Sequence, residues 1–305
     1  MPSLEPSQGE KSLLGVLQTS LDRFSPTQRT IAQFLLTRFD EAVFLTAAGL
    51  AKRIGTSEAS VVRFARSLGY GGFPEFREDL QVLFREKVRP IDRMERGPGI
   101  PRKPEAILDR VIEQAQGNIR ETRKQLDAVA LEAAAKALAG ARVRYVLGLN
   151  ASVGVAELLG HHLRKMLPNV RVLTEGGPIL FDESSSLGAG DAIVAFSYPR
   201  YAKWTGEVVR HAKARKATTI AVTDSRLAPV GQIADITLVA RADSLSFGCS
   251  YVAPMLVVDA LVSAILTVSG KAVRARLDGI DVLLYAHDFF LADHPHSLRD
   301  GRGLG

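Results

Sequence analysis

Cysteine is nearly absent from this sequence of 305 residues, in which Cys249 is the only one. A single cysteine excludes an internal disulfide framework and a zinc site built from several cysteines, and it is typical of a reducing compartment. Uninterrupted apolar runs never approach the roughly 18 residues of a membrane-spanning helix, and the N-terminus, MPSLEPSQGEKS, lacks the basic and then apolar order of a signal peptide. These absences predict a cytoplasmic protein with no membrane partner.

A catalytic arrangement is also missing. His161 and His162 are adjacent and do not have the i, i+4 spacing of a zinc protease helix. Asp293, His294 and His296 belong to a tail that contains proline and glycine, where a disordered end is favoured over a metal site. No serine or cysteine nucleophile is matched to a base. The sequence therefore predicts no enzyme activity, no cofactor and no bound metal.

The composition is that of a globular protein, with 46% hydrophobic and 24% charged residues. The length allows two domains at roughly 100 to 200 residues each. Lys and Arg number 39 against 33 Asp and Glu, which gives a net charge of +6. The excess is concentrated in residues 44–66, where Glu58 is the only acidic residue among several basic ones. A local basic cluster favours a nucleic-acid partner more than the overall charge does.

The chain divides into segments of different pattern. The N-terminal part carries apolar residues at helical spacing, and Ser25 and Pro26 mark a helix start as cap and first-turn residue. A stretch with several prolines and glycines among charged residues then predicts a linker. The predicted segments are a helical domain at 1–88, a linker at 89–103, a second domain at 104–270, entered by a helix over 105–125, and a C-terminal helix and tail at 271–305.

The second domain alternates strand-like apolar runs with helical stretches. The runs are short and rich in β-branched residues, as expected for strands buried on both faces of a parallel sheet. This alternation predicts an α/β fold, a doubly wound parallel sheet, which binds ligands at the carboxyl ends of its strands. The predicted strands are Val143–Leu149, Ala192–Ser197, Thr218–Asp224 and Ala234–Ala240, and the predicted helices are Ser152–Met166, Trp204–Arg215 and Ala253–Val268.

Residues Thr46–Tyr70 have the pattern of a helix-turn-helix. Gly55 falls in the turn, which needs a residue that tolerates a left-handed conformation, and the small Ala51 falls where two helices cross closely. Thr56 or Ser57 is expected to cap the second helix. The apolar residues on the inner faces are Leu50, Ile54, Val61 and Phe64.

The second helix of this motif presents polar residues outward. Arg63 suits a bidentate contact with guanine, whereas the other basic residues suit phosphate contacts, which position a protein without specifying sequence. The alternative is an ordinary helical hairpin with a solvated polar face. The helix pattern together with the local basic charge favours double-stranded DNA as the partner. The expected DNA-binding residues are Lys52, Arg53, Ser57, Glu58, Ala59, Ser60, Arg63 and Arg66.

The run LGYGGFPEFR follows the second helix and places a signature at Leu68, Gly69, Tyr70, Gly72, Phe73 and Phe76. Its glycines are suited to end the second helix, and its aromatic residues are suited to fold the next helix back onto the core. With the motif before it, this run resembles the N-terminal domain of the RpiR (MurR/RpiR) family of bacterial transcriptional regulators. The resemblance implies a DNA-binding regulator.

A loop of small residues, Gly148–Ser152, follows the first predicted strand. Its backbone N–H groups and the dipole of the next helix suit a phosphate or a carboxylate. A dinucleotide-binding fold requires Gly-x-Gly-x-x-Gly, but Asn150 and Val153 occupy two of the three glycine positions. The loop instead resembles the Gly-x-Gly-x-Ser loop of the SIS (sugar isomerase) domain, which RpiR regulators carry after their DNA-binding domain. That resemblance implies that Ser152 and nearby amides bind a sugar phosphate.

A second loop, Ser197–Thr205, follows the next predicted strand and departs from the SIS pattern Ser-x-Ser-Gly-x-Thr. Pro199 and Arg200 replace the second Ser and the Gly, which exchanges neutral phosphate donors for a cation. An anionic ligand still fits, whereas the case for a phosphosugar is weakened. The alternative is that Tyr201 and Trp204 are core residues and Arg200 is solvated. The expected ligand-binding residues are Gly148, Asn150, Ser152, Ser197, Tyr198, Arg200, Tyr201, Lys203, Thr205 and Ser246.

These features predict a transcription regulator whose helical domain binds operator DNA and whose SIS-like domain binds a small anionic effector, a sugar phosphate or a related acid. A homodimer or homotetramer is expected, because one recognition helix gives limited affinity and two-fold symmetric half-sites are the usual remedy. The alternative is a sugar-phosphate isomerase with a helical appendage, although no catalytic base is identifiable.

Overall fold

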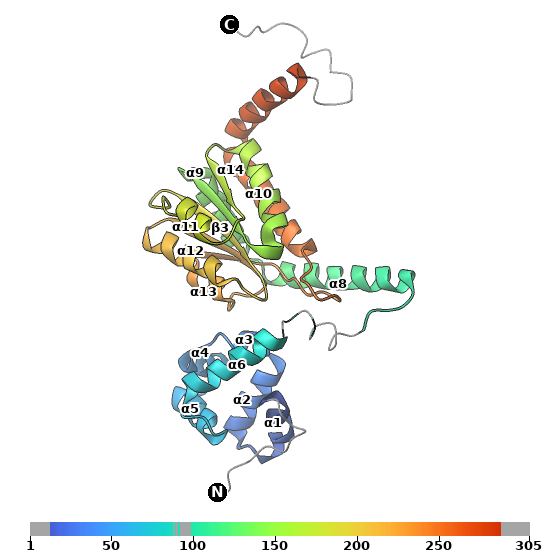
Figure 1. Cartoon of the computed structure of the whole chain (residues 1–305), viewed down its shortest axis with the longest axis vertical. Coiled ribbons are helices and arrows are strands. Elements are labelled where there is room, and N and C mark those ends of the chain that lie inside the picture. The colour runs from blue at the N-terminus through green and yellow to red at the C-terminus, as the bar shows by residue number, and fades with distance from the viewer. Residues whose placement is uncertain (1–12, 88, 90, 92–98, 288–305) are drawn as a thin grey trace. The chain divides into compact units, whose positions relative to one another are not determined.

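The computed structural model describes residues 13–87, 89, 91 and 99–287 (Figure 1). The chain divides into two compact units, a helical unit that extends to Ile112 and an α/β unit that holds the greater part of the chain from Glu113 onward. Most of the predicted linker and the tail residues Asp293, His294 and His296 lie outside the described residues.

The helical unit begins with short helices that pack around two longer ones. The first long helix starts at a capping box, in which Ser25 Oγ accepts from the backbone N–H of Gln28 and Gln28 Oε1 accepts from the N–H of Ser25. This confirms the helix start predicted at Ser25 and Pro26. The elements are α1 (Leu13–Thr19), η1 (Leu21–Arg23), α2 (Pro26–Thr37), α3 (Phe39–Ala42), α4 (Ala47–Ile54), α5 (Glu58–Ser67) and α6 (Phe73–Lys87).

Aromatic side chains join α5 to α6 in the core of this unit. Phe64 and Phe76 are fully buried, and their rings meet edge to face with centroids 6.1 Å apart. Tyr70 packs on Phe76 at 5.1 Å, and the positive φ of Gly69, 96°, ends α5 just before it. The run LGYGGFPEFR therefore folds α6 back onto the core as the sequence predicts.

The α/β unit is a five-stranded parallel sheet in the order β2-β1-β3-β4-β5. Helices α9, α10 and α14 pack together on one face, and α11, α12 and α13 lie on the other (Figure 1). The strands are β1 (Arg144–Gly148), β2 (Val170–Leu173), β3 (Ala192–Ser197), β4 (Thr218–Thr223) and β5 (Ile236–Val239), and the helices are α8 (Pro104–Gln125), α9 (Ala128–Gly140), η2 (Asn150–Ser152), α10 (Val153–Met166), α11 (Pro178–Ser184), α12 (Lys203–Ala214), α13 (Pro229–Ile233) and α14 (Val252–Ala286).

The predicted doubly wound fold is confirmed. Helices α9, α11 and α13 were not among the predicted helices, and β2 and α14 also differ from the prediction. The edge strand β2 was not among the predicted strands, because it is short, only Leu173 in it is buried, and Arg171 interrupts its apolar run. The helix predicted over Ala253–Val268 continues as one element through a kink at Ser269 to Ala286, so the C-terminal helix expected beyond residue 270 is its second half.

Helix α14 is the one described helix that is long and apolar enough, by length and composition, to cross a membrane, with a mean hydropathy of 2.0 over a window of 18 residues. Core helices of soluble proteins pass the same test. The side chains of Val257, Leu261 and Ile265 are fully or almost fully buried in the core cluster of the α/β unit, and α14 packs against α9 and α10 (Figure 1). Asp259, on the other face, is exposed. One face of this helix therefore contributes to the core of the unit, whereas other apolar side chains of the helix, such as Met255, Leu256 and Leu266, are exposed.

Candidate functional site

The helix-turn-helix is formed by α4 and α5. Thr46 Oγ1 accepts from the N–H of Gly49 and caps α4, and Ser57 Oγ accepts from the N–H of Ser60 and caps α5. Between the helices, Gly55 adopts a left-handed conformation with φ 72° and ψ 37°. Both caps satisfy backbone donors that the helix leaves unpaired, so local residues determine where each helix begins.

The crossing of α4 and α5 buries the residues that the pattern predicts. Ala51 is 4% exposed, Leu50 and Phe64 are fully buried, and Val61 is 1% exposed. Ile54 is only partly buried. A larger side chain at Ala51 would separate the two helices, because protein cores are close-packed.

The outward face of α5 holds a chain of linked polar side chains. Ser57 Oγ lies 2.9 Å from Ser60 Oγ, which in turn accepts from Arg63 Nη2 at 2.9 Å. Arg66 Nε donates to the carbonyl oxygen of Gly71, five residues further along the chain, at 3.4 Å. Arg63 is therefore held in place on the exposed face, and an arginine held in this way loses less side-chain entropy on binding. Of the predicted DNA-binding residues, Ser60 is partly buried and the others are exposed, namely Lys52, Arg53, Ser57, Glu58, Ala59, Arg63 and Arg66.

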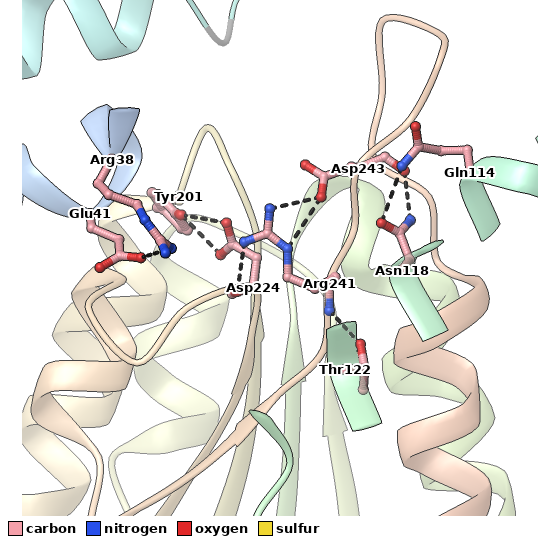
Figure 2. A network of polar contacts seen from close by, with 9 residues as sticks. All are labelled: Arg38, Glu41, Gln114, Asn118, Thr122, Tyr201, Asp224, Arg241 and Asp243. Carbon is pink, nitrogen blue, oxygen red and sulfur yellow. Dashed lines mark hydrogen bonds and ion pairs between the residues drawn. The ribbon is translucent and has the colours of Figure 1, made fainter. Parts of the chain in front are cut away.

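One predicted DNA contact already has an acidic partner. Arg53 Nη2 pairs with Glu41 Oε2 at 3.1 Å. The other oxygen of Glu41 pairs with Arg38 at 3.1 Å, as Figure 2 shows. Lys52 has no such pair among the described residues. The positive charge near the recognition helix is thus carried mainly by Lys52, Arg63 and Arg66.

In the α/β unit, the strand order places a topological switch point between β1 and β3. The two strands are neighbours, and the chain leaves their carboxyl ends toward helices on opposite faces of the sheet. Ligands of open α/β sheets bind in the crevice at this point. The two loops singled out in the sequence, Gly148–Ser152 and Ser197–Thr205, follow these two strands.

The first loop requires glycine at its start. A Cβ on Gly148 would lie 2.5 Å from the carbonyl oxygen of Ser152 and 2.6 Å from the Cβ of Ala156. Asn150 has a positive φ of 54°, a conformation that asparagine tolerates better than most residues. Ser152 is buried, and its Oγ lies 3.1 Å from the hydroxyl of Tyr251.

The second loop begins with two buried hydroxyl groups that have no hydrogen-bond partner among the described residues. Ser197 Oγ and Tyr198 Oη make no hydrogen bond with any described residue, although both side chains are at most 5% exposed. Burial raises the pKa of Tyr198 well above its ordinary value, so its hydroxyl remains a donor. A buried group without a partner costs about 1–3 kcal/mol. The site therefore holds donors and acceptors that a bound polar ligand would satisfy.

The cations of the second loop are exposed. Arg200 has φ 75°, a left-handed conformation that costs a non-glycine residue about 1–2 kcal/mol, and its guanidinium is in no ion pair within the described part of the chain. Lys203 pairs with Glu207 at 3.4 Å. Thr205 is buried, whereas Trp204 is 43% exposed and meets Phe181 edge to face at 6.3 Å, so Trp204 is not a core residue.

Tyr201 donates to both carboxylate oxygens of Asp224, at 2.9 and 3.0 Å (Figure 2). Burial raises the pKa of Asp224 to about 6, although the hydrogen bond from Tyr201 and the charge of Arg241 act in the opposite direction. Arg241 Nη1 donates to the backbone carbonyl of Asp224 at 3.4 Å. Tyr201 is therefore part of a polar network. It is neither an apolar core residue nor a loop residue without side-chain contacts.

Three residues of this region were not among the predicted ligand-binding residues. Asp224 ends the run of β4, Arg241 follows β5, and Tyr251 precedes α14. Their positions directly after strands or before a helix were the available signal. Ser246, which was among the predicted residues, is exposed and pairs with Ser244, and no hydrogen bond joins it to Ser152 or Ser197 in the described part of the chain.

A helix-turn-helix with an exposed basic second helix, followed by a parallel α/β domain with polar groups at its switch point, is the organisation of a DNA-binding regulator with a second domain. Comparison with protein families agrees. Residues 11–87 match the helix-turn-helix domain of the rpiR family, and residues 137–264 match the SIS domain. The chain belongs to the RpiR family and is a DNA-binding transcriptional regulator with a SIS domain.

Relatives and solved structures share this organisation. The chain is 27% identical over 228 residues to an uncharacterized HTH-type transcriptional regulator of Haemophilus influenzae, covering 74% of this chain and 77% of the relative. It is 27% identical over 215 residues to the regulator HexR of Pseudomonas aeruginosa, covering 70% and 73%.

Among solved structures, the sugar isomerase domain of an RpiR transcription factor from Sphaerobacter thermophilus matches with a TM-score of 0.56 and 31% identity, over 57% of this chain and 98% of that one. Vibrio vulnificus NanR, solved in complex with ManNAc-6P, matches with a TM-score of 0.62 and 22% identity, over 92% and 100%. At that identity, the NanR structure shows a shared fold.

Proposed function

We propose that this regulator responds to a small anionic effector, a sugar phosphate or a related acid, which binds at the switch point between β1 and β3. The observation that carries this proposal is the pair of buried hydroxyls, Ser197 Oγ and Tyr198 Oη, that accept or donate no hydrogen bond within the described part of the chain. The NanR structure supports the ligand class, because its fold is shared and it holds ManNAc-6P.

The effector is bound by groups from both loops. Ser152 and the amides of the first loop lie at the start of η2 and α10. The helix dipole favours an anion in this region. Arg200 supplies a positive charge, and its strained backbone is of the kind that persists at functional sites. The residues proposed to bind the effector are Gly148, Asn150, Ser152, Ser197, Tyr198, Arg200, Tyr201, Lys203 and Thr205 from these loops, and Ser246.

Operator DNA is bound by the outward face of α5. Arg63, held by Ser60, contacts a base edge, and Lys52 and Arg66 contact phosphates. Arg53 joins them when it exchanges Glu41 for a phosphate. Ser57, Glu58 and Ala59 lie at the N-terminal end of α5, the part of a recognition helix that contacts bases.

The regulator acts as a homodimer or homotetramer in the cytoplasm. A two-fold symmetric pair of recognition helices engages two half-sites and raises the affinity beyond that of one helix. Residues 1–88 form its DNA-binding domain, 89–103 its linker, 104–270 its effector domain and 271–305 its C-terminal helix and tail.

A thermal-shift screen of sugar phosphates, sugar acids and amino-acid-derived acids tests the effector site. We expect at least one of these anions, with N-acetylmannosamine 6-phosphate as the first probe, to raise the melting temperature of the full chain. Ser152→Ala and Arg200→Ala should remove that shift. Arg215→Ala, at the exposed far end of α12, is the matched control and should retain it. The effector proposal fails if no anion stabilises the wild type.

A further inference from the structure

A polar network lies at the carboxyl ends of β3, β4 and β5 and reaches α8 (Figure 2). Its central residue is Arg241, whose guanidinium binds Asp243 Oδ2 through Nε at 3.2 Å and Nη2 at 2.7 Å while Nη1 contacts the carbonyl of Asp224. The network is defined by Tyr201, Asp224, Arg241, Asp243, Thr122 and Asn118.

At one end, the network holds the loop that carries Arg200. Tyr201 is the next residue in the chain, and its hydroxyl binds both oxygens of Asp224. Thr223 Oγ1 adds a hydrogen bond to the Ser197 carbonyl at 2.6 Å, so β4 fixes the beginning of this loop as well. A ligand that draws Arg200 toward its anionic group therefore acts on Tyr201 directly.

At the other end, the network holds α8 against the α/β unit through hydrogen bonds. Thr122 and Asn118 are the buried residues of this helix, at 0% and 2% exposure. Thr122 Oγ1 accepts from the backbone N–H of Arg241 at 2.9 Å, and Asn118 Nδ2 donates to the carbonyl of Asp243 at 2.7 Å. Hydrogen bonds depend on direction, whereas apolar contacts tolerate sliding. The seating of α8 therefore depends on the backbone position of Arg241 and Asp243.

Helix α8 is also the element that enters the α/β unit from the predicted linker. We propose that the network transmits occupancy of the effector site to α8, with Tyr201 and Asp224 as the sensing end and Thr122 and Asn118 as the receiving end. This inference rests on the proposed effector site. It requires that the effector bind the two arrangements of the network with different affinity, because a ligand that binds both equally shifts nothing.

Hydrogen exchange of the full-length protein without ligand tests the network from both ends. Tyr201→Phe removes one hydroxyl, and we expect amide exchange in residues 114–125 to accelerate about fivefold, the effect of losing one hydrogen bond. Thr122→Val removes the acceptor at the other end and should accelerate exchange in residues 197–205, because coupling is reciprocal. Tyr145→Phe is the matched control, since its hydroxyl binds Ser186 outside the network.

Unchanged exchange in residues 114–125 of Tyr201→Phe, together with unchanged exchange in residues 197–205 of Thr122→Val, overturns the inference. A second arm adds N-acetylmannosamine 6-phosphate to saturation. Protection that changes at both 197–205 and 114–125 in the wild type, but only at 197–205 in Thr122→Val, supports it, whereas a wild-type change confined to 197–205 contradicts it. If no anion binds, the effector proposal fails, and the ligand-free measurements still decide whether the network couples its two ends.

Discussion

The helix-turn-helix and the switch point of the sheet differ in whether their polar side chains are hydrogen-bonded. At the start of α5, the hydroxyls of Ser57 and Ser60 and the exposed guanidinium of Arg63 are linked to one another. At the switch point, Ser197 Oγ and Tyr198 Oη are buried and linked to nothing described. The surface proposed to bind DNA therefore has its polar side chains already linked in the free protein. In a sensor, buried polar groups that form hydrogen bonds only with the ligand make the ligand bind one conformation more tightly than another. The binding free energy can then shift the equilibrium between the two conformations.

The largest expected effect comes from the glycine that shapes the switch point. Gly148→Val places a side chain where even a Cβ meets the Ser152 carbonyl at 2.5 Å, and we expect a loss of about 3 kcal/mol or more in the free energy of unfolding of the α/β unit. Gly154→Ala is the matched control, because a Cβ there meets no atom within 4 Å. It should be neutral or stabilise α10 by up to about 1 kcal/mol. Urea denaturation measures both. If Gly148→Val and Gly154→Ala were equally stable, the close approach of β1 to α10 would not be required for the stability of the α/β unit.

The next largest effect concerns the exposed face of α5. Arg63→Ala should weaken binding to a duplex selected from a random pool by about 1–3 kcal/mol and relax preference at one base position. Arg66→Ala should instead weaken binding to all sequences similarly and lower the salt dependence by about one phosphate contact. Fluorescence anisotropy at several salt concentrations separates the two. Retained sequence preference in Arg63→Ala would exclude this arginine as a base contact.

The sequence predicts much of this arrangement, but not the part that distinguishes the two regions. The helix-turn-helix is local, since its caps, turn and crossing residue all fall between Thr46 and Phe64, and short-range pattern suffices. The loops at the switch point are also visible, because they follow apolar strands. The contact of Ser152 with Tyr251 joins residues 99 positions apart, and the network of Asp224 and Arg241 depends on β4 and β5 being neighbours. Neither periodicity nor composition specifies such contacts.

A smaller effect tests the difference in polar satisfaction directly. Tyr198→Phe removes a buried hydroxyl that has no described partner, so the free energy of unfolding should stay constant or rise by about 1 kcal/mol. Effector binding should weaken in the same variant. Tyr145→Phe, which breaks the contact with Ser186, should instead lose about 1 kcal/mol. Denaturation and thermal shift with the best-binding anion give the two readouts. A stability loss in Tyr198→Phe as large as that in Tyr145→Phe would mean that the hydroxyl has a partner in the free protein.

The smallest effect is the pH dependence contributed by Asp224, whose pKa of about 6 exceeds its ordinary value of 3.8. Because the folded state binds this proton more tightly than the unfolded state, the contribution favours folding at low pH and is lost as the pH rises from about 4 to about 6. Replacing the group with Asp224→Asn should therefore flatten the fall in stability over this interval, while Tyr201 and Arg241, which favour the ionised form, remain in place. Denaturation at about pH 4.5, 5.5 and 6.5 measures the slope. An identical slope in the wild type and the variant would place the pKa of Asp224 at its ordinary value and remove this distinction between the sensing network and the exposed, linked face of α5.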